Sequence, residues 1–270
     1  MAPTGQLLAQ FLSPSQILAT AATLCRKSAL SGTPVIAAAA GAIYVVGKTF
    51  ENGVPVQRLH SLDITTGAER PNSPVVMQET VAGTGSGSSS GGLNFDPKWS
   101  IQRPGLLLLN GYLYIGFASH CDFSSWHGWM IAYDGATLRQ TSALAMTPNG
   151  TGSGVGMSGV APAAEIINGI PRFFVSTGNG TFDSNGDYGD DILRIEAPNG
   201  VMKIADHFTS YNPDALNVAD NDVSSGGPML LPDQAFGGHQ RMLVLAAKEG
   251  RSYVVDRDNM GGFSATTNNL

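Results

Sequence analysis

The sequence predicts an all-β protein assembled from a repeated unit of short strands. Glycine accounts for 34 of the 270 residues, about 13% against a usual level of about 7%. Charged residues make up only 13% of the chain, about half the usual share, while 42% of it is hydrophobic. Short runs rich in Val, Ile, Tyr and Phe alternate with segments rich in Gly, Asn, Asp and Pro. This composition excludes a coiled coil and a disordered chain, and it favours a compact protein with many turns.

The strand pattern recurs four times along the chain. Each copy pairs two β-rich runs, and the second run ends on an acidic residue. In the first copy, Asp63-Ile-Thr-Thr-Gly67 is typical of a tight turn in which a carboxylate accepts backbone N–H groups. The four acidic residues give a period of about 60 to 71 residues and are Asp63, Asp134, Glu196 and Asp256.

An apolar run precedes each of these pairs, and a further short strand can follow it. Four antiparallel strands per unit is the make-up of a β-propeller blade. We therefore expect residues 1–30 to form an N-terminal segment, partly helical or irregular, and residues 31–270 to form a partial β-propeller. Its blades, about four in number and four-stranded, are expected at residues 31–80, 100–147, 158–206 and 225–270.

The first repeat resembles those of the quinoprotein alcohol dehydrogenase-like β-propellers, which are also called pyrroloquinoline quinone (PQQ) repeats. Longer motifs are similar to a secreted or periplasmic subgroup of PQQ-like propellers; they include Thr177-Gly-Asn-Gly-Thr-Phe-Asp183, Gly186-Asp-Tyr-Gly-Asp190 and Lys248-Glu-Gly250. The tryptophan that usually closes such a repeat is absent after Gly67 and after Leu138. The resemblance covers roughly residues 31 to 263.

The resemblance implies a ring of seven or eight blades, of which this chain supplies about four. An arc of four blades would leave sheet edges unpaired. We therefore expect the chain to be a fragment of a larger propeller, or to be completed by another copy, with a small four-bladed ring as the alternative. The resemblance also implies PQQ and Ca²⁺ as candidate cofactors, and a secreted or periplasmic location.

Propeller topology gathers the unusual side chains on one rim. In a blade whose strands run up and down, the loop after the second strand and the connection to the next blade leave at the same end. The loops are expected at residues 49–57, 119–128, 178–191 and 248–250, and the connections at residues 80–104, 147–159 and 206–227. They hold most of the His, Trp and loop Asp residues, which makes this rim the candidate binding face.

One loop of the rim alternates side chains that carry oxygen, as a hard cation such as Ca²⁺ requires. It is not an EF-hand, because Tyr188 stands where that loop needs glycine. The alternatives are a calcium site and a turn whose Asx side chains accept bonds from backbone N–H groups. The candidate calcium ligands are Asp183, Asn185, Asp187 and Asp190.

A second group on the rim combines His120, Cys121 and Asp122 with Trp126 and His127. Adjacent strand residues point to opposite faces, so His120 and Cys121 would not readily share a metal ion. Trp126 and His127, with His120, are candidates to line a pocket for a sugar or a quinone, because an indole stacks on flat or CH-rich ligands. The alternative role is packing between blades.

The connection before the fourth repeat is acidic. Asp220 and Asp222 are candidates for a cation site or for an acid/base pair, although one residue apart they point in different directions on an extended chain. A solvated loop is the alternative. Lys248 and Arg251 are expected to be surface charges or salt-bridge partners.

These features favour a non-catalytic binding or scaffold segment, which presents one loop-rich rim to a protein or glycan partner and adjoins the remaining propeller blades. The alternative is part of a PQQ- and Ca²⁺-dependent alcohol or sugar dehydrogenase. No residue can be matched to the Ca²⁺ ligands or to the catalytic, proton-abstracting Asp of those enzymes, and the chain has no Cys-x-x-Cys-His haem motif.

A nucleic-acid ligand, a membrane span and a disulfide bond are not expected. The net charge of −6 and the scattered basic residues argue against a nucleic-acid ligand. Uninterrupted apolar runs stay below the roughly 18 residues of a membrane span. Cys25 and Cys121 have no metal-ligand spacing, and we expect two unpaired thiols rather than a disulfide.

Overall fold

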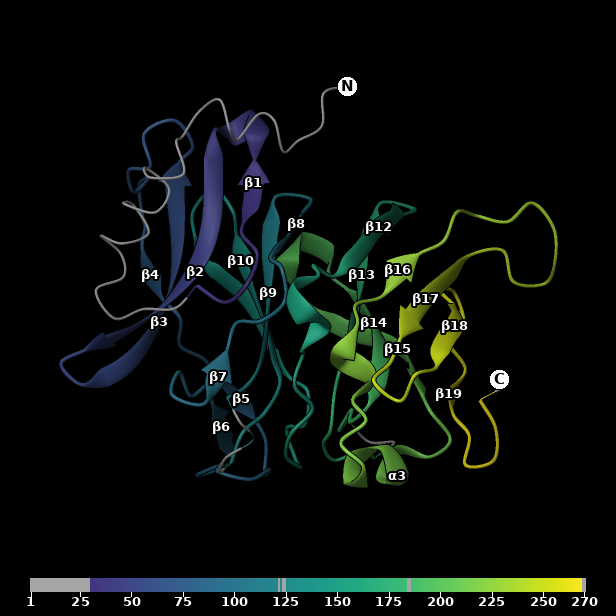
Figure 1. The fold of residues 1–270 in the computed structure, drawn as a ribbon. Coiled ribbons are helices and arrows are strands. Elements are labelled where there is room, and N and C mark those ends of the chain that lie inside the picture. The colour runs from purple at the N-terminus through teal and green to yellow at the C-terminus, as the bar shows by residue number, and fades with distance from the viewer. Residues whose placement is uncertain (1–29, 121, 123–124, 184–185, 269–270) are drawn as a thin grey trace.

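Four antiparallel sheets follow one another along the chain in the computed structural model (Figure 1). The structure describes residues 30–120, 122, 125–183 and 186–268. The expected N-terminal segment therefore lies outside the described residues up to residue 29, as do Cys25, Cys121 and Asn185.

The first two sheets have the up-and-down order that a propeller blade requires. Sheet 1 has the order β1-β2-β3-β4, and the one-turn 3-10 helix η1 (Ala38–Ala40) links its first two strands. In sheet 2, β9 pairs with β8, β10 and the short β7, and β11 lies at the far edge. The strands are β1 (Val35–Ala37), β2 (Ala42–Glu51), β3 (Val54–Asp63), β4 (Val75–Val76), β7 (Ser100–Ile101), β8 (Leu107–Leu109), β9 (Tyr112–Ser119), β10 (Trp129–Asp134) and β11 (Gln140–Ala145).

Sheet 3 repeats this order as β12-β13-β14-β15, and β19 adds to it in parallel beside β15. Sheet 4 has the order β16-β17-β18. The strands are β12 (Ala163–Ile167), β13 (Ile170–Ser176), β14 (Asp191–Glu196), β15 (Lys203–Thr209), β16 (Met229–Leu230), β17 (Met242–Ala246), β18 (Ser252–Asp256) and β19 (Gly262–Phe263).

The connections between sheets carry the remaining short elements. A separate hairpin of β5 and β6 follows sheet 1, and α3 lies between sheets 3 and 4; both are at the lower end of Figure 1. These elements are β5 (Thr80–Ala82), β6 (Gly92–Asn94), η2 (Met157–Gly159), η3 (Pro198–Gly200), α3 (Pro213–Val218) and η4 (Val223–Ser225). None of the helices in the described part of the chain has the length and apolar character needed to cross a membrane.

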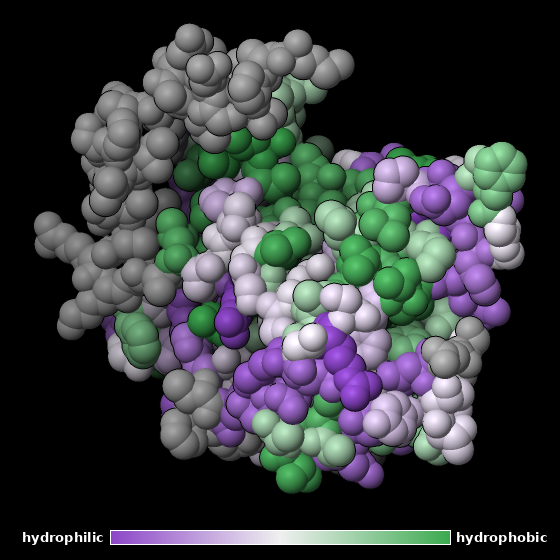
Figure 2. Space-filling view, turned by 45° about the vertical axis from the view of Figure 1, so that its right-hand side comes forward, coloured by the Kyte–Doolittle hydropathy of each residue, from purple (hydrophilic) through white to green (hydrophobic). Residues whose placement is uncertain are grey.

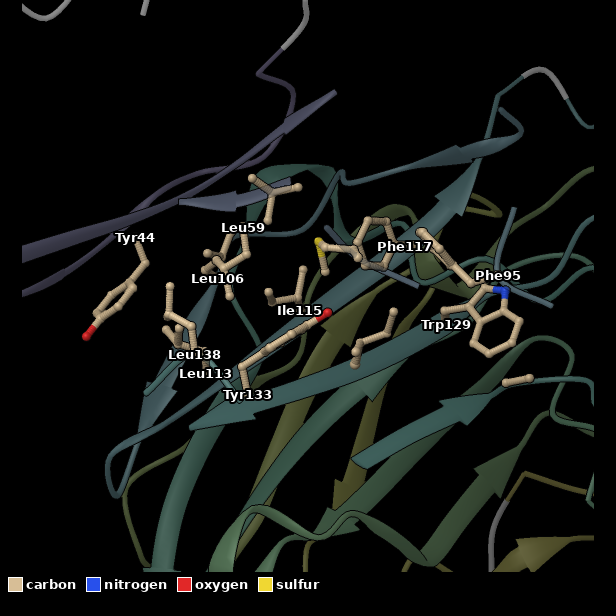
Figure 3. Packing of buried hydrophobic residues seen from close by; sticks show 14 of the residues in the cluster. Tyr44, Leu59, Phe95, Leu106, Leu113, Ile115, Phe117, Trp129, Tyr133 and Leu138 are labelled. Atoms are coloured by element: carbon tan, nitrogen blue, oxygen red, sulfur yellow. The ribbon is translucent and has the colours of Figure 1, made fainter. Parts of the chain in front are cut away.

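The hydrophobic core lies in three layers, one between each pair of successive sheets. Strand β9 shows why: Leu113, Ile115 and Phe117 pack toward sheet 1 (Figure 3). Tyr114, one residue out of phase, packs toward sheet 3. Residues on both faces of each central strand are therefore buried, which accounts for the low content of charged residues. Stacked sheets of three to five mostly antiparallel strands confirm the predicted all-β propeller class.

Aromatic side chains fix the first of these layers. Phe95 from the connection packs edge-on against Phe117, with 4.8 Å between the ring centroids, and against Trp129 at 5.8 Å. Tyr44 of sheet 1 donates a 2.7 Å hydrogen bond to the backbone oxygen of Gly135 at the end of sheet 2. The phenol thus closes one end of the apolar layer with a satisfied polar group.

The structure corrects two sequence-based expectations. The expected loop at residues 49–57 is a continuous hairpin, because Asn52 and Gly53 adopt positive φ angles of 52° and 82° and form the tight turn that matches strand twist. The fourth blade has three strands among the described residues rather than four. After Asp256 the chain turns through Gly261 and Gly262, both at positive φ, and pairs with sheet 3 as β19.

Candidate functional site

Loops from all four sheets meet at the end of the molecule that carries β5, β6 and α3 (Figure 1). Backbone hydrogen bonds tie them together: Ser86 N–H donates to Gly150, Ser153 N–H to Asn179, and Lys248 N–H to Asp222. The loops therefore form one continuous surface. We call this end of the molecule the rim.

Two adjoining hollows in the rim, of about 310 and 370 Å³, share Asp122, Trp126 and Asn179 in their walls. We call them together the rim cleft. Glycines 154, 156 and 178 form part of its floor. A side chain at Gly178 would clash with Asp222 Oδ1 and lie 2.9 Å from Ser224 Oγ, so both of these cleft side chains would have to shift to admit it. The other polar residues that line the cleft are Arg103, Ser119, Thr151, Ser158, Thr181, Asp214, Asn217, Asp222, Ser224, Ser225 and Lys248.

The three candidate pocket residues, His120, Trp126 and His127, have different surroundings in the structure. Trp126 is half-buried in the wall of the cleft. His127 is buried: its Nδ1 lies 3.0 Å from Thr147 Oγ1 and its Nε2 2.8 Å from the Ser86 carbonyl oxygen. His120 lies at the end of β9, where burial and the nearby Lys48 lower its imidazole pKa. Only Trp126 of the three therefore contributes to the cleft.

A charged triad borders the cleft. Lys248 Nζ lies 2.6 Å from Asp220 Oδ2 and 3.3 Å from Asp222 Oδ2. This contact raises the pKa of the Lys248 ammonium group and lowers that of the Asp220 carboxyl. Across the cleft, burial and the two carboxylates of the triad raise the pKa of Asp122. Lys248 was predicted to be a surface charge or a salt-bridge partner, but no sequence pattern paired it with Asp220 and Asp222 of the preceding connection.

Asn179 connects this triad to the cleft wall. Its Nδ2 donates a 2.8 Å hydrogen bond to Asp220 Oδ1, and its backbone N–H donates to Asp222 Oδ1 at 3.2 Å. Its side-chain oxygen is buried and accepts no hydrogen bond from the described residues. Asn179 follows the glycine of the Thr177-Gly-Asn motif, which was recognised only as part of a family pattern.

The proposed calcium ligands do not converge on one point in the described part of the loop. Asp183 Oδ1 accepts the backbone N–H of Asp187 at 3.1 Å, and Asp187 Oδ1 accepts that of Asn149 at 3.0 Å. Asp190 Oδ1 accepts the N–H of Val223 at 3.0 Å, and Asn185 lies outside the described residues. Each described carboxylate thus accepts a bond from a different backbone segment; Asp183 holds its own loop, whereas Asp187 and Asp190 tie the loop to the distant residues Asn149 and Val223.

Asp190 is nevertheless unusual, because only 1% of its surface is exposed and its Oδ2 has no hydrogen-bond partner among the described residues. Burial, with smaller contributions from Asp222 and Asp220, raises its pKa to about 7. Across the residues that the structure describes, no three His, Cys, Asp or Glu side chains gather closely enough to hold a metal ion.

Comparison with known proteins shows the fold. No family model and no curated protein matches the sequence. Among solved structures, the chain is similar to the quinohemoprotein alcohol dehydrogenase ADHIIG of Pseudomonas putida HK5, with a TM-score of 0.51 and 15% identity over 82% of this chain. It is also similar to the quinohemoprotein alcohol dehydrogenase of Comamonas testosteroni, with a TM-score of 0.47 and 17% identity over 86% of this chain. The chain spans 32% and 42% of the lengths of these proteins.

Proposed function

We propose that this chain is a non-catalytic binding segment of a β-propeller, and that it holds a carbohydrate in the rim cleft. The observation that carries this proposal is the half-buried indole of Trp126, which both hollows of the cleft share. An indole face packs well against the CH groups of a sugar ring. Carboxylate, amide and hydroxyl groups surround it and would meet the sugar hydroxyls.

The charges of the cleft favour a neutral ligand. Asp220 and Asp222 hold Lys248 in the charged triad, and Arg103 faces the same space as Asp122. The two cationic groups, Arg103 and Lys248, face four carboxylates, because Asp214 also lines the cleft, so an anionic ligand would be repelled and would lose its hydration. A neutral sugar can instead donate hydroxyl hydrogens to the carboxylates, and such charge-assisted bonds are the stronger kind.

A glycan array tests this function directly. The wild-type protein and the Trp126→Ala variant are applied to the same array at micromolar concentration. We expect a restricted set of neutral glycans to retain the wild type but not the variant. Retention of no glycan by the wild type, or equal retention of both proteins, would contradict the proposal.

One observation favours the dehydrogenase alternative as a second candidate. Asp122, Asn179 and Asp222 present oxygen atoms to one cleft, and these are ligands of the kind that Ca²⁺ prefers. They would hold the ion, while Arg103 and Lys248 would face the carboxylates of a PQQ molecule. When bound, such a cofactor supplies the two-electron acceptor for alcohol oxidation.

This alternative has its own experiment. PQQ and Ca²⁺ are added to the protein, and the melting temperature and dye-linked oxidation of alcohols and sugars are recorded. A melting temperature raised by both additions together, with turnover that Asp222→Asn removes, would favour the dehydrogenase. A neutral-glycan ligand without any response to PQQ and Ca²⁺ is the result that the binding function predicts.

We also propose that the protein is exported from the cytoplasm, to the periplasm or the medium. Export is supported by the similarity of the repeats to those of secreted and periplasmic propellers. Fractionation of cells that produce the native protein would test it, and recovery in the cytoplasmic fraction alone would contradict it.

A further inference from the structure

The rim cleft has two hollows, and each of them has the size of a ligand site by itself. Sites for small molecules usually enclose about 300 to 1,000 Å³. The hollow lined by Lys248 measures about 310 Å³, and the hollow lined by Phe182 measures about 370 Å³. We call them the Lys248 hollow and the Phe182 hollow. Asp122, Trp126 and Asn179 line both, so the two hollows adjoin along these side chains.

The side chains between the hollows are held in place by the protein itself. The N–H of Gly152 donates a 2.9 Å hydrogen bond to the backbone oxygen of Trp126. The indole ring packs against Gly154, where a methyl group would lie 3.3 Å from Cζ3 of the ring. Asn179 is fixed by the 2.8 Å hydrogen bond from its Nδ2 to Asp220. Because these groups are ordered before a ligand arrives, binding does not have to order them.

The Phe182 hollow adds a second aromatic ring to the cleft. Phe182 is partly exposed and packs against Phe263, with 4.9 Å between the ring centroids. Together with Trp126, it gives this hollow two aromatic rings, against which the CH groups of a sugar ring can pack. Asp214 and Asn217 of α3 form a polar margin beside them.

The Lys248 hollow has a different lining. Trp126 is the one aromatic residue among the described residues that line it, and charged and hydroxyl groups make up most of the rest. Such a surface suits the hydroxyl groups of a sugar unit better than its CH groups. The rim, at the lower end of Figure 2, accordingly shows mostly hydrophilic residues with a few hydrophobic ones among them. The serines that line this hollow are Ser119, Ser158, Ser224 and Ser225.

We propose that the rim cleft binds a neutral oligosaccharide of at least two sugar units, with one unit in each hollow and the linkage between them beside Trp126. This inference rests on the proposed binding function and adds the length of the ligand. One unit packs on the rings of Trp126 and Phe182, and the other places its hydroxyl groups in the Lys248 hollow. A single sugar unit fills one hollow and leaves the contacts of the other unmade, so it should bind much more weakly.

An array of neutral mono-, di- and trisaccharides of glucose, galactose, mannose, xylose and N-acetylglucosamine tests the required length. Calorimetry then compares a retained disaccharide with its two component monosaccharides. We expect the disaccharide to bind at one site, at least about tenfold more tightly than either monosaccharide. A monosaccharide that binds as tightly as the disaccharide, or at two sites, would overturn the required length and leave the binding function standing. Retention of no saccharide of any length would contradict the binding function itself.

Variants of the Phe182 hollow test where the second unit lies. Phe182→Ala removes the second ring and should weaken disaccharide binding at least about tenfold. Asn217 is exposed on α3, so Asn217→Trp fills the same hollow without removing a core contact and should have a similar effect. Phe236→Ala is the matched control, because Phe236 is 88% exposed and does not line the cleft, and it should bind as the wild type does.

Melting temperatures show whether each of these variants folds. If Phe182→Ala does not fold, Asn217→Trp alone decides the question. Disaccharide binding that Trp126→Ala weakens but both variants of the Phe182 hollow leave unchanged would overturn the second unit while the binding function stands.

Discussion

Glu165 on β12 is bonded to Arg257, which follows β18, with 3.1 Å between Glu165 Oε2 and Arg257 Nη1. The other oxygen of Glu165 lies 2.6 Å from Nε of Arg172, its cross-strand neighbour on β13. The two arginine side chains are only 4% and 7% exposed. The Glu165 carboxylate therefore bridges the two buried guanidinium groups and links sheets 3 and 4, while Asp258 pairs with Arg172 and Asp233 with Arg257 as well.

Replacing this carboxylate should destabilise the protein strongly. We expect Glu165→Ala to lower the free energy of unfolding by about 2 kcal/mol, because both buried guanidinium groups lose one carboxylate, although Arg172 keeps Asp258 and Arg257 keeps Asp233. Urea denaturation measures the change. Glu51→Ala, which breaks the more exposed pair of Glu51 with Arg58, is the control and should leave the midpoint almost unchanged. Equal effects of the two variants would contradict a structural role for Glu165.

The buried carboxyl of Asp190 should make stability depend on pH. Its pKa of about 7 in the folded protein lies above the usual value near 4. Between pH 4 and pH 7 the folded state therefore binds more protons than the unfolded state, and stability falls as pH rises. The loss amounts to roughly 4 kcal/mol, given 1.36 kcal/mol for each pKa unit.

Asp190→Asn tests this prediction, because an amide keeps the oxygen that accepts the Val223 N–H. The difference in unfolding free energy between wild type and variant should change steeply from pH 4 to pH 8. Contributions from other groups, such as Glu51 with its pKa lowered to about 2, cancel in that difference. A difference that is constant with pH would show that Asp190 titrates normally.

Close packing of the rim loops depends on Gly128. A side chain there would overlap the backbone carbonyl oxygen of Ser153. That backbone cannot move without disturbing the hydrogen bonds between the rim loops, such as Ser153 N–H to Asn179 O. We expect Gly128→Ala to cost about 2 kcal/mol or more in unfolding free energy. At Gly238 there is open space and no positive φ, so Gly238→Ala should change stability by less than about 0.5 kcal/mol. Thermal denaturation of both variants tests this prediction, and equal melting temperatures of the two would contradict it.

The turn that follows the third strand of a blade should contribute to the stability of the protein separately in each blade. Asp134 Oδ1 accepts the backbone N–H groups of Ala136 and Thr137 at 3.0 and 2.8 Å. Asp134→Ala should therefore cost about 1 kcal/mol, whereas Asp134→Asn, which retains an oxygen acceptor, should cost less. If both variants have the same melting temperature as the wild type, the carboxylate does not stabilise the turn.

These turns were predictable because their chemistry is local. Asp63 and Asp256 also accept backbone N–H groups two and three residues ahead. Glu196 occupies the same place in the third repeat, but its carboxylate lies 4.0 Å from Arg194 Nε instead. The longer glutamate side chain and the Pro198 that follows replace the Asx turn with the 3-10 turn η3.

The site was less predictable because its contacts join distant parts of the chain. The strand spacing placed Trp126 on the rim, where it lies, but nothing local showed that His127 would turn inward to Ser86 and Thr147. Lys248 was expected to be a surface charge or a salt-bridge partner, and its partners, Asp220 and Asp222, lie on the preceding connection. Only the stacking of sheets 3 and 4 brings these groups to the cleft.

Calorimetric titration of an array-selected neutral glycan tests the proposed binding function most directly. The wild-type protein should bind it with one site. Trp126→Ala should weaken binding at least tenfold, or about 1.4 kcal/mol. Trp99→Ala removes a partly buried tryptophan that packs against Lys98 outside the cleft, and it should bind as the wild type does. Equal affinity of the Trp126→Ala variant and the wild type would contradict a carbohydrate site in the rim cleft.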